Sequence, residues 1–512
     1  MECMDWSDGY VSEVDYTYGY YGELNPLQTK LKLLFAGIKP PEVKTACELG
    51  FGQGVSLLSN SAGSNIAWYG NDFNPNQVAF VHEAINDTGL SLNATDEDFE
   101  RFCSRSDLPG FDFIALHGIW SWISEKNRKI ISRFIAEKLN VGGVLYISYN
   151  SEPGRTAIRP FRDLMEWHSR SMSAPHAPLG KKIENSISFM EKLLSVEPAY
   201  STAHPYVAKT FQEIVKKDRN YLAHEYFNAD WAPMSIKDLS DYLTGGKLQF
   251  AASANPIELL PNINFTKDQL QLIDSIGEPI FKEYVKDFCI NQDFRRDLWI
   301  KGGRRLSAAE REKELLSTCV TLVTPAKNIK LEIETTLGKA SLNKEIYQPI
   351  IDYFNGKSRV ALSDAAKQLE DKVSLQQIFE VCIVLAGKGV LCLVQDDIVI
   401  TSSKARTDKL NAFLIEQSQY GTKVDFLTSP VTSSAVSVSR FEQMFLSVLN
   451  DNAVSAHAIA SQVWRRLKSQ NEKIVSDGKV LSSDQDNINF LENQASRFLE
   501  DKLPILEKLQ IA

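Results

Sequence analysis

The feature that most constrains the fold is a turn with glycine at every second position: Gly50, Gly52 and Gly54. An apolar run, residues 43–49, precedes the turn, and a segment with a helical pattern, residues 55–58, follows it. Glycine tolerates positive φ and lets a ligand approach the backbone closely. The N-terminus of the next helix favours negative charge. A strand, a tight turn and a helix in this order predict a site for a small, partly anionic ligand.

The spacing of the glycines separates two kinds of nucleotide site. A dinucleotide fingerprint requires G-x-G-x-x-G or G-x-G-x-x-A, whereas the sixth position here is Val55 counted from Gly50 and Leu57 counted from Gly52. The pattern E-L-G-x-G-x-G, which starts at Glu48, resembles motif I of class I S-adenosylmethionine (AdoMet)-dependent methyltransferases. The resemblance implies that Glu48 orients the methionine amino group of AdoMet. A glycine-rich turn that binds nothing stays open as the alternative.

A second strand is predicted at residues 65–71, and it leads into Asn71, Asp72 and Phe73. Asp72 lies 22 residues after Gly50, close to the roughly 20 expected for a carboxylate that binds ribose hydroxyls. A carboxylate suits this task because it accepts two hydrogen bonds from vicinal hydroxyls. We predict that these three residues contact the cofactor. A turn residue at the strand end, or a helix N-cap, is the alternative for Asp72.

Two more buried strands are predicted at residues 111–116 and 144–150, with a helix at residues 127–139 between them. A continuous apolar run is what a strand covered on both faces of a parallel sheet requires. The first run ends in His117 and Gly118, at the edge where open α/β sheets bind ligands. Strands alternating with helices predict an α/β protein with a Rossmann-like, doubly wound sheet.

Later segments narrow the resemblance to one group. The motifs H-G-x-x-S-W, starting at His117, and S-Y-N-x-x-P-G, starting at Ser148, are similar to those of bacterial methyltransferases with a methyltransferase regulatory domain. The rickettsial lysine methyltransferases of outer-membrane proteins belong to that group. Two later stretches, residues 287–297 and 427–432, fit it as well. Relatives often have tryptophan where this chain has Arg155, which puts the shape of the substrate mouth in doubt.

The resemblance implies a set of site residues. Aromatic surroundings lower the pKa of a lysine by desolvation, and aromatic faces hold methylammonium groups. The predicted catalytic residues are His117, Trp120, Tyr149 and Asn150. The predicted cofactor contacts are Tyr18, Glu48, Gly50, Gly52, Gly54, Asn71, Asp72, Phe73, Asp96, Glu97, His117 and Gly118. Two alternatives stay open: His117 acts as a base or as a hydrogen-bond donor near the ribose, and Asp96 and Glu97 only cap a helix.

The N-terminal segment is rich in tyrosine: Tyr10, Tyr16, Tyr18, Tyr20 and Tyr21. Tyrosine offers a flat apolar face together with a hydroxyl group. The segment is therefore either a lid over the cofactor or an arm that packs on the first domain.

Composition excludes several classes. The formal net charge is −9, which argues against a dominant nucleic-acid footprint. The 7 cysteines form no C-x-x-C pair, so neither a disulfide framework nor a metal site is indicated. The acidic N-terminus is unlike a signal peptide, and no apolar run reaches the roughly 18 residues of a membrane span. We predict a cytoplasmic protein with no membrane insertion.

The length of 512 residues predicts two to four domains. A helical insertion is the candidate for a substrate cap and for a homodimer contact. A basic cluster from Arg295 to Arg305 is either a solvated face or a surface for an acidic substrate protein. The winged-helix-like part combines three helices with a hairpin whose turn is Asp396-Asp397. The predicted parts are an AdoMet-binding core with an aromatic arm (1–155), a helical insertion that returns to the sheet through an edge strand at 248–253 (156–260), a helical middle region (261–330), a winged-helix-like domain (331–406) and a helical C-terminal region (407–512).

The leading functional prediction is transfer of methyl groups from AdoMet to lysine side chains of a protein. The expected substrate is an unfolded or partly folded outer-membrane protein. The same catalytic domain acting on a glycan or a small molecule is the first alternative, because a fold does not determine its substrate. A non-catalytic scaffold that binds a partner is the second.

Overall fold

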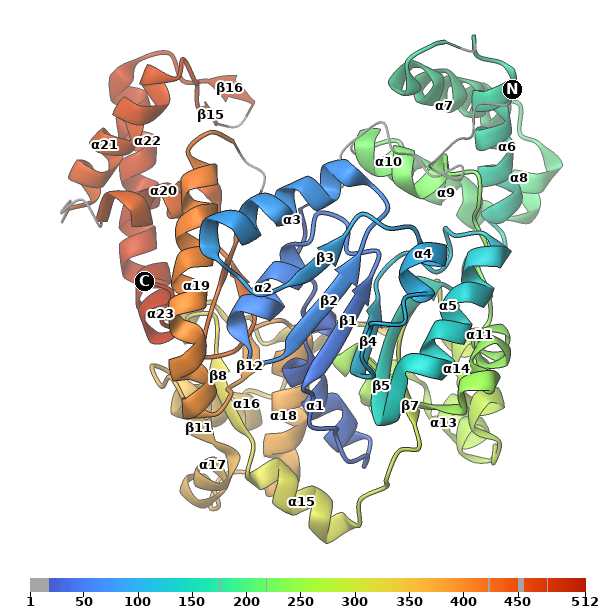
Figure 1. Cartoon of the computed structure of the whole chain (residues 1–512), viewed down its shortest axis with the longest axis horizontal. Helices are drawn as coiled ribbons and strands as arrows, with labels where there is room; N and C mark the ends of the chain where they lie inside the picture. The colour runs from blue at the N-terminus through green and yellow to red at the C-terminus, as the bar shows by residue number, and fades with distance from the viewer. Residues whose placement is uncertain (1–17, 175, 218, 422–423, 450–454, 477) are drawn as a thin grey trace.

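A seven-stranded sheet forms the centre of the molecule (Figure 1). The computed structural model describes residues 18–512 apart from 175, 218, 422–423, 450–454 and 477, so Tyr10 and Tyr16 lie outside the described residues. The strand order is β3-β2-β1-β4-β5-β7-β6. The strands are β1 (Thr45–Leu49), β2 (Ala67–Asn71), β3 (Asn93–Thr95), β4 (Phe111–Leu116), β5 (Leu139–Asn150), β6 (Leu248–Ser253) and β7 (Phe294–Lys301). The predicted Rossmann-like sheet is confirmed.

The first five strands are parallel, and β7 runs antiparallel to both of its neighbours. The apolar run of β4 is covered on both faces, as Ile114 and Ala115, which point to opposite faces, show by their complete burial. Strand β6 confirms the predicted edge strand that returns to the sheet. Because parallel strands share one carboxyl edge, the glycine turn after β1, Asp72 after β2 and His117 after β4 lie at the same edge.

Strand β7 corrects the prediction that residues 266–315 are helical throughout. The strand begins with charged residues, which are not typical of a buried strand. Arg295 and Asp297 are nevertheless buried, together with Asp287. The Arg295 guanidinium donates to the Asp297 carboxylate at 3.1 Å and to Asp287 at 2.5 Å. The Tyr149 hydroxyl donates to Asp297 at 2.8 Å. Pairing of this kind is what allows ions to enter a sheet core.

The predicted basic cluster is therefore not one surface. Arg295 is buried, and Arg296 pairs with Glu23 at 3.4 Å. The Lys301 ammonium donates to main-chain carbonyls at 2.8 Å. Arg304 and Arg305 are the members of the cluster that are exposed.

Two sets of helices cover the sheet. One face packs against α2 (Val55–Gly63) and α3 (Pro75–Thr88). The other face packs against α4 (Phe99–Cys103), α5 (Glu125–Lys138), α11 (Ile236–Leu243) and α14 (Pro279–Ile290). Helix α1 (Pro26–Phe35) precedes the first strand and buries Leu31, Leu33 and Leu34.

A group of helices inserted after β5 has a core of its own. The helices are α6 (Arg159–Ser171), α7 (Leu179–Ser195), α8 (Ala199–Ala203), α9 (Pro205–Ile214) and α10 (Arg219–Tyr226). They confirm the predicted helical insertion, with α9 and α10 replacing one longer helix. Figure 1 shows α10 nearest to the sheet and α6 to α9 farther out. Trp122, from the loop after β4, is part of this core, so the insertion is anchored beside the sheet edge.

The three helices of the expected winged-helix-like part are present as α16 (Lys344–Phe354), α17 (Leu362–Gln368) and α18 (Leu375–Gly387). The predicted hairpin is wrong. Strand β12 (Leu391–Leu393) pairs with the earlier strand β8 (Cys319–Leu322), which also pairs with β11 (Val360–Ala361). Asp396 and Asp397 begin α19 (Asp397–Ser418), because acidic residues are favourable at a helix N-terminus.

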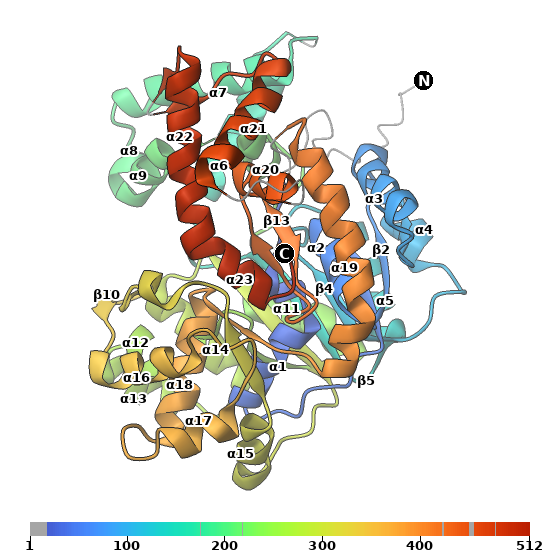
Figure 2. The ribbon, with the colours of Figure 1, turned by 90° about the vertical axis from the view of Figure 1, so that its left-hand side faces the viewer.

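The C-terminal region packs on the outside of α2 and α3, as Figure 2 shows for α19. It ends in the predicted amphipathic helices, with Phe498, Leu506 and Leu509 buried. No helix in the described part of the chain is both long and apolar enough to cross a membrane. The helices of the C-terminal region after α19 are α20 (Arg440–Leu449), α21 (Ala456–Ser469), α22 (Asp484–Arg497) and α23 (Leu503–Lys508).

Helix α19 and the residues just before it also close the far end of α2. The Arg406 guanidinium donates to the carbonyls of Ala62 and Ser64, at 3.3 and 2.6 Å. The Gln395 amide donates to the Gly63 carbonyl at 2.8 Å. These bonds satisfy carbonyls that a helix end leaves without partners. The helix that begins at the glycine turn is thus held at its other end by a segment more than 300 residues later in the chain.

We expect Arg295→Met to lower the stability strongly. The change leaves the Asp287 and Asp297 carboxylates buried without their cation, and breaking a buried pair costs about 3–5 kcal/mol. The thermal midpoint, measured by calorimetry, should fall by several degrees. Arg304→Met is the control, because its exposed pair with Glu310 is worth about 0–1 kcal/mol. Equal midpoints for the two variants would contradict the buried network.

Candidate functional site

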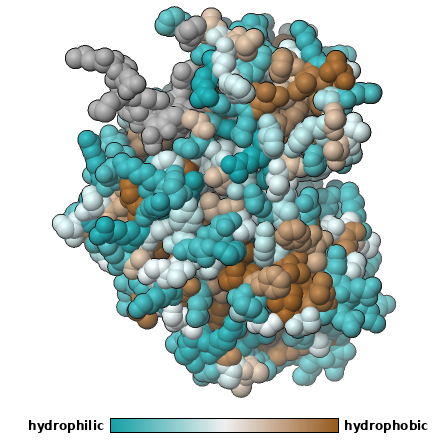
Figure 3. Space-filling model, turned by 90° about the vertical axis from the view of Figure 1, so that its right-hand side faces the viewer, coloured by the Kyte–Doolittle hydropathy of each residue, from teal (hydrophilic) through white to brown (hydrophobic). Residues whose placement is uncertain are grey.

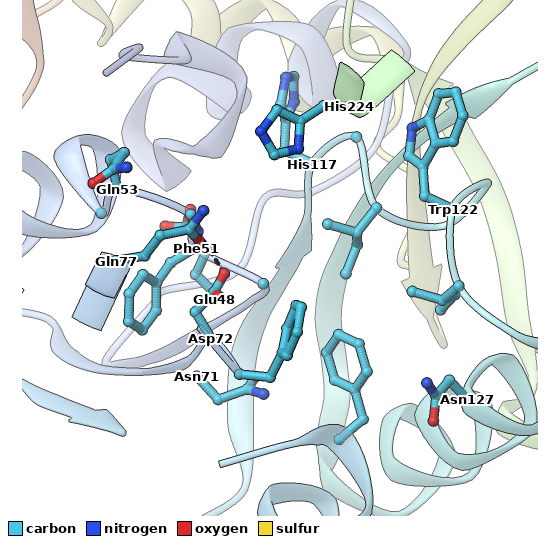
Figure 4. A pocket seen from close by; sticks show the side chains of 18 of the residues that line it. Glu48, Phe51, Gln53, Asn71, Asp72, Gln77, His117, Trp122, Asn127 and His224 are labelled. Carbon is cyan, nitrogen blue, oxygen red and sulfur yellow. Dashed lines mark hydrogen bonds between the residues drawn. The ribbon is translucent and has the colours of Figure 1, made fainter. Parts of the chain in front are cut away.

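A cavity of about 650 Å³ opens at the carboxyl edge of β1, β2 and β4 (Figure 4). Its size is within the range of small-molecule sites. The glycine turn and the end of β2 form one wall, and the loop after β4 forms the floor. Residues of α10 face them from the helical insertion.

The glycine turn has the backbone that its sequence predicts. Gly50, Gly52 and Gly54 have φ values of +68°, +58° and +70°. A Cβ atom on Gly54 would lie 2.3 Å from the Val81 side chain, and one on Gly50 would lie 3.0 Å from Ile119. Side chains are excluded by both conformation and space. Helix α2 begins directly after the turn, so its N-terminus faces the cavity.

Asp72 holds this turn in place. One carboxylate oxygen accepts a hydrogen bond from the Gly52 amide at 2.8 Å, and the other accepts from the Asn74 amide at 3.0 Å. With its amide oriented to satisfy both ends, Gln77 donates to the two oxygens at 3.0 and 3.2 Å. Burial raises the pKa of Asp72 to about 7, against these hydrogen bonds. Asp72 is therefore a turn residue and also part of the cavity wall.

Three polar atoms on the same wall are buried and, within the described residues, have no hydrogen-bond partner. They are Oε2 of Glu48, Oε1 of Gln53 and Oδ1 of Asn71. Buried polar groups are normally satisfied, so this wall suits a ligand that brings donors such as an ammonium group and hydroxyls. Burial, with the nearby Asp72 carboxylate, raises the pKa of Glu48 to about 8. A cationic ligand would donate hydrogen bonds to these acceptors and would lower the pKa of Glu48.

His117 closes the cavity beside the turn. Its Nδ1 lies 2.8 Å from the Tyr146 hydroxyl, and the Tyr21 ring stacks on the imidazole at 3.9 Å. Burial lowers the pKa of His117 to about 4, so the ring is neutral at pH 7. Such a ring is a weak proton acceptor, which favours the hydrogen-bonding alternative over the base. The Gly118 amide donates to Ser148 Oγ at 2.8 Å.

The described tyrosines divide between the two predicted roles. Tyr21 lines the cavity, as expected of a lid. Tyr18 meets Phe80 edge-on at 5.2 Å, and Tyr20 packs near Phe426, as expected of an arm.

The cavity brings together nine of the residues predicted from the sequence: Glu48, Gly50, Gly52, Gly54, Asn71, Asp72, Phe73, His117 and Gly118. The others lie elsewhere. Trp120 and Tyr149 are buried on the far face of the sheet, where the Trp120 indole donates to Met234 at 3.1 Å. Asn150 is buried at the end of β5, with its amide bonded to Ser121. These three side chains, like that of Tyr18, are not among the described residues that line the cavity.

The segment after β3 lines the cavity with residues a little further along the chain than predicted. Asp98, Phe99 and Glu100 line it, whereas Asp96 and Glu97 do not lie on the described wall. Glu97 instead pairs with Arg105 at 3.2 Å. The sequence of residues 96–100 alone does not indicate which of its acidic residues lines the cavity.

Sequence reasoning missed several lining residues. Gln53 and Gln77 are ordinary polar residues whose role appears only in the fold. Trp122 lies within the H-G-x-x-S-W motif that marked the loop, and it stacks on Trp231 at 5.9 Å. His224 and Glu225 come from α10, more than 100 residues after β4. Figure 4 shows His224 beside His117, and Trp122 across the cavity from Gln53 and Gln77.

Comparison with known proteins places this site in a family. The chain is 34% identical to protein sll1526 of Synechocystis, over 99% of this chain and 100% of that protein. Residues 218–301 match the domain described as "predicted methyltransferase regulatory domain". The chain belongs to the family of AdoMet-dependent methyltransferases that carry this domain.

Two rickettsial proteins are also similar. RP789 of Rickettsia prowazekii is 24% identical over 88% of this chain and 85% of its own length. The structure of PKMT2 from Rickettsia typhi in complex with AdoHcy is similar over 97% of this chain and 100% of that chain, with a TM-score of 0.70 and 18% identity. At that identity the match shows a shared fold. The family's regulatory domain is not a separate body in this chain, since residues 218–301 supply α10, β6 and β7.

We expect Gly54→Ala to destabilise the turn more than Gly89→Ala. Both glycines have φ of +70°, but a Cβ on Gly54 meets Val81 at 2.3 Å, whereas nothing lies within 4 Å of one on Gly89. Gly89→Ala therefore measures the conformational cost alone, which is of order 1 kcal/mol. The thermal midpoint should fall further for Gly54→Ala, and equal shifts would count against the packing described for the turn.

Proposed function

We propose that the protein transfers methyl groups from AdoMet to lysine side chains of a protein substrate. The supporting observation is that one cavity has two complementary walls. The wall of the glycine turn carries unsatisfied buried acceptors, and the wall opposite carries Trp122 and Glu225. The first suits a cofactor with an ammonium group and ribose hydroxyls, and the second suits a cationic amine.

The residues of the glycine wall would hold the cofactor. The Glu48 carboxylate accepts the amino group, and Asp72 accepts from the ribose hydroxyls. The three glycines allow close approach to the backbone, while Tyr21 and His117 cover the cavity beside the turn. When bound, AdoMet supplies an electrophilic methyl group, so the protein needs chiefly to align the acceptor, remove its proton and exclude water.

The opposite wall supports an amine as the acceptor. Trp122 presents an indole face that is kept in place by stacking on Trp231, and aromatic faces attract ammonium and methylammonium groups. The surrounding apolar surface favours the neutral amine by desolvation. Lys126, the lysine on this wall, is paired with Glu100 at 2.6 Å. Negative charge therefore outweighs positive charge around the cavity.

A protein substrate is supported by the family and by the surface. The motifs of this chain resemble those of the rickettsial lysine methyltransferases, and PKMT2 from Rickettsia typhi, whose structure holds AdoHcy, has the same fold. Leu272, Phe281 and Phe288 are 55%, 56% and 61% exposed on α13 (Lys267–Asp274) and α14. Figure 3, which faces this side, shows apolar patches between polar surroundings. Such patches suit apolar segments of an unfolded or partly folded outer-membrane protein. The homodimer suggested by the helical insertion stays a prediction.

Incubation with radiolabelled AdoMet and a denatured outer-membrane protein extract tests the proposal. We expect label in protein, recovered as methyl-lysine after hydrolysis. Label in a small-molecule or glycan fraction would contradict the lysine proposal and favour the first alternative. No transfer to either fraction would contradict the enzyme and favour a scaffold.

Glu48→Gln serves as the control that ties transfer to this cavity. Loss of a charge-assisted hydrogen bond costs about 1.5–3 kcal/mol, so the affinity for AdoHcy measured by calorimetry should fall about tenfold or more. Transfer at low AdoMet should fall with it. Unchanged affinity would show that the cofactor binds elsewhere.

A further inference from the structure

Glu225 occupies a distinct position in the cavity. It belongs to α10 and lines the cavity, and its neighbour His224 lies beside His117 in Figure 4. Resting on the proposed function, we propose that Glu225 binds the ammonium group of the acceptor lysine and takes its proton, and that Arg155 sets the charge of this carboxylate. This assigns a catalytic residue to the insertion and a positioning residue to the loop after β5.

The position of Arg155 is set by the backbone before it. A Cβ on Gly154 would lie 2.5 Å from the Gln292 carbonyl oxygen and 2.6 Å from the Asp293 Cα, so the loop is pressed against the chain that enters β7. Arg155 then pairs with Asp293 at 3.4 Å and interacts with the charge of Glu225. Arg155 is thus held by this loop and by Asp293 at a place from which its charge acts on the proposed base.

The other carboxylates on the described cavity wall, and His117, are already engaged. Glu100 pairs with Lys126, and Asp98 accepts from the Arg101 amide at 2.8 Å as the N-cap of α4. Glu48 and Asp72 belong to the cofactor wall. His117 is neutral and engages Tyr146, so it is a poor proton acceptor. Of the carboxylates on the described cavity wall, Glu225 is therefore the one available on the acceptor side.

The surroundings of Glu225 place its ionisation near neutral pH. Burial raises the pKa of Glu225 to about 7, against the lowering effect of the Arg155 guanidinium. The phenols of Tyr221 and Tyr226 and the imidazole of His224 complete the titratable groups around it. A general base works best when its pKa is close to the operating pH.

The chemistry balances with this one base. The Glu225 carboxylate takes a proton from the lysine ammonium, which leaves a neutral amine and a protonated Glu225. The nitrogen lone pair then forms the new C–N bond as the bond from the methyl carbon to the sulfonium sulfur breaks, with its electron pair remaining on sulfur. The product is a methylammonium group, and Glu225 releases its proton to solvent.

Glu225→Gln tests the role of the carboxylate, with Glu213→Gln, an exposed change on α9, as the matched control. In the transfer assay described above we expect kcat to fall at least 100-fold, while calorimetry shows unchanged affinity for AdoHcy. The control should behave as the wild type. Retention of kcat by Glu225→Gln would overturn the assignment alone. Absence of transfer by the wild type would overturn the proposed function instead.

Arg155→Met tests the positioning role through the pH profile. Loss of the guanidinium removes the lowering effect on the pKa of Glu225, so the acid limb of kcat/KM, near pH 7 in the wild type, should move to higher pH. A structural role would lower activity without moving this limb. An unmoved limb would therefore overturn the assignment of Arg155.

Thermal midpoints give a readout that needs no substrate. A carboxyl whose folded pKa is raised above its unfolded value favours folding below the unfolded pKa, and this contribution is lost as pH rises through the folded pKa of about 7. Glutamine lacks this dependence. The midpoint of Glu225→Gln relative to the wild type should therefore increase between pH 5 and pH 8. A constant difference would show that Glu225 does not titrate in this range and would overturn the proposal.

Discussion

The hydrogen bond from the Gly52 amide to the Asp72 carboxylate is the interaction on which the rest of the site depends. It joins the turn after β1 to the residue after β2, and it does so at 2.8 Å inside the protein. The turn can donate this bond because its glycines adopt positive φ. With the turn in place, α2 starts toward the cavity and the Glu48 carboxylate is held with one oxygen unsatisfied.

The rest of the chain supports this turn from outside. Arg406 of α19 and Gln395 just before it cap the far end of α2, and α19 covers the same helix. The family's regulatory domain extends the sheet through β6 and β7 and supplies α10. The wall of the glycine turn and the wall that carries Trp122 and Glu225 thus come from segments far apart in the sequence.

Most residues of the glycine-turn wall could be predicted because their signals are local, whereas the roles of Gln53 and Gln77 depend on the fold. Three glycines, an acid at the end of each of two strands and His-Gly after β4 are all determined within a few residues. Strand β7 could not be predicted in the same way, since Arg295 and Asp297 look like surface residues until their pairing is known. The same limit applied to Asp396 and Asp397, which suit either a turn or a helix start.

Two kinds of residue were the hardest to assign to the site from the sequence. For some, the face of the sheet decides whether they line the cavity; for others, contacts between distant segments decide it. Trp120 and Tyr149 are aromatic and close to the site in sequence, yet they lie on the far face of the sheet. Trp122, two residues from Trp120, lines the cavity instead. Glu225 has no local signal, because its position relative to β4 is determined by the packing of the whole insertion.

A crystal structure of the protein with AdoHcy tests the central claim most directly. The account predicts the ribose hydroxyls at the Asp72 carboxylate, the amino group at Glu48, and the sulfur facing the wall that carries Trp122 and Glu225. AdoHcy bound outside this cavity, or bound within it with its sulfur turned away from Glu225, would contradict the account.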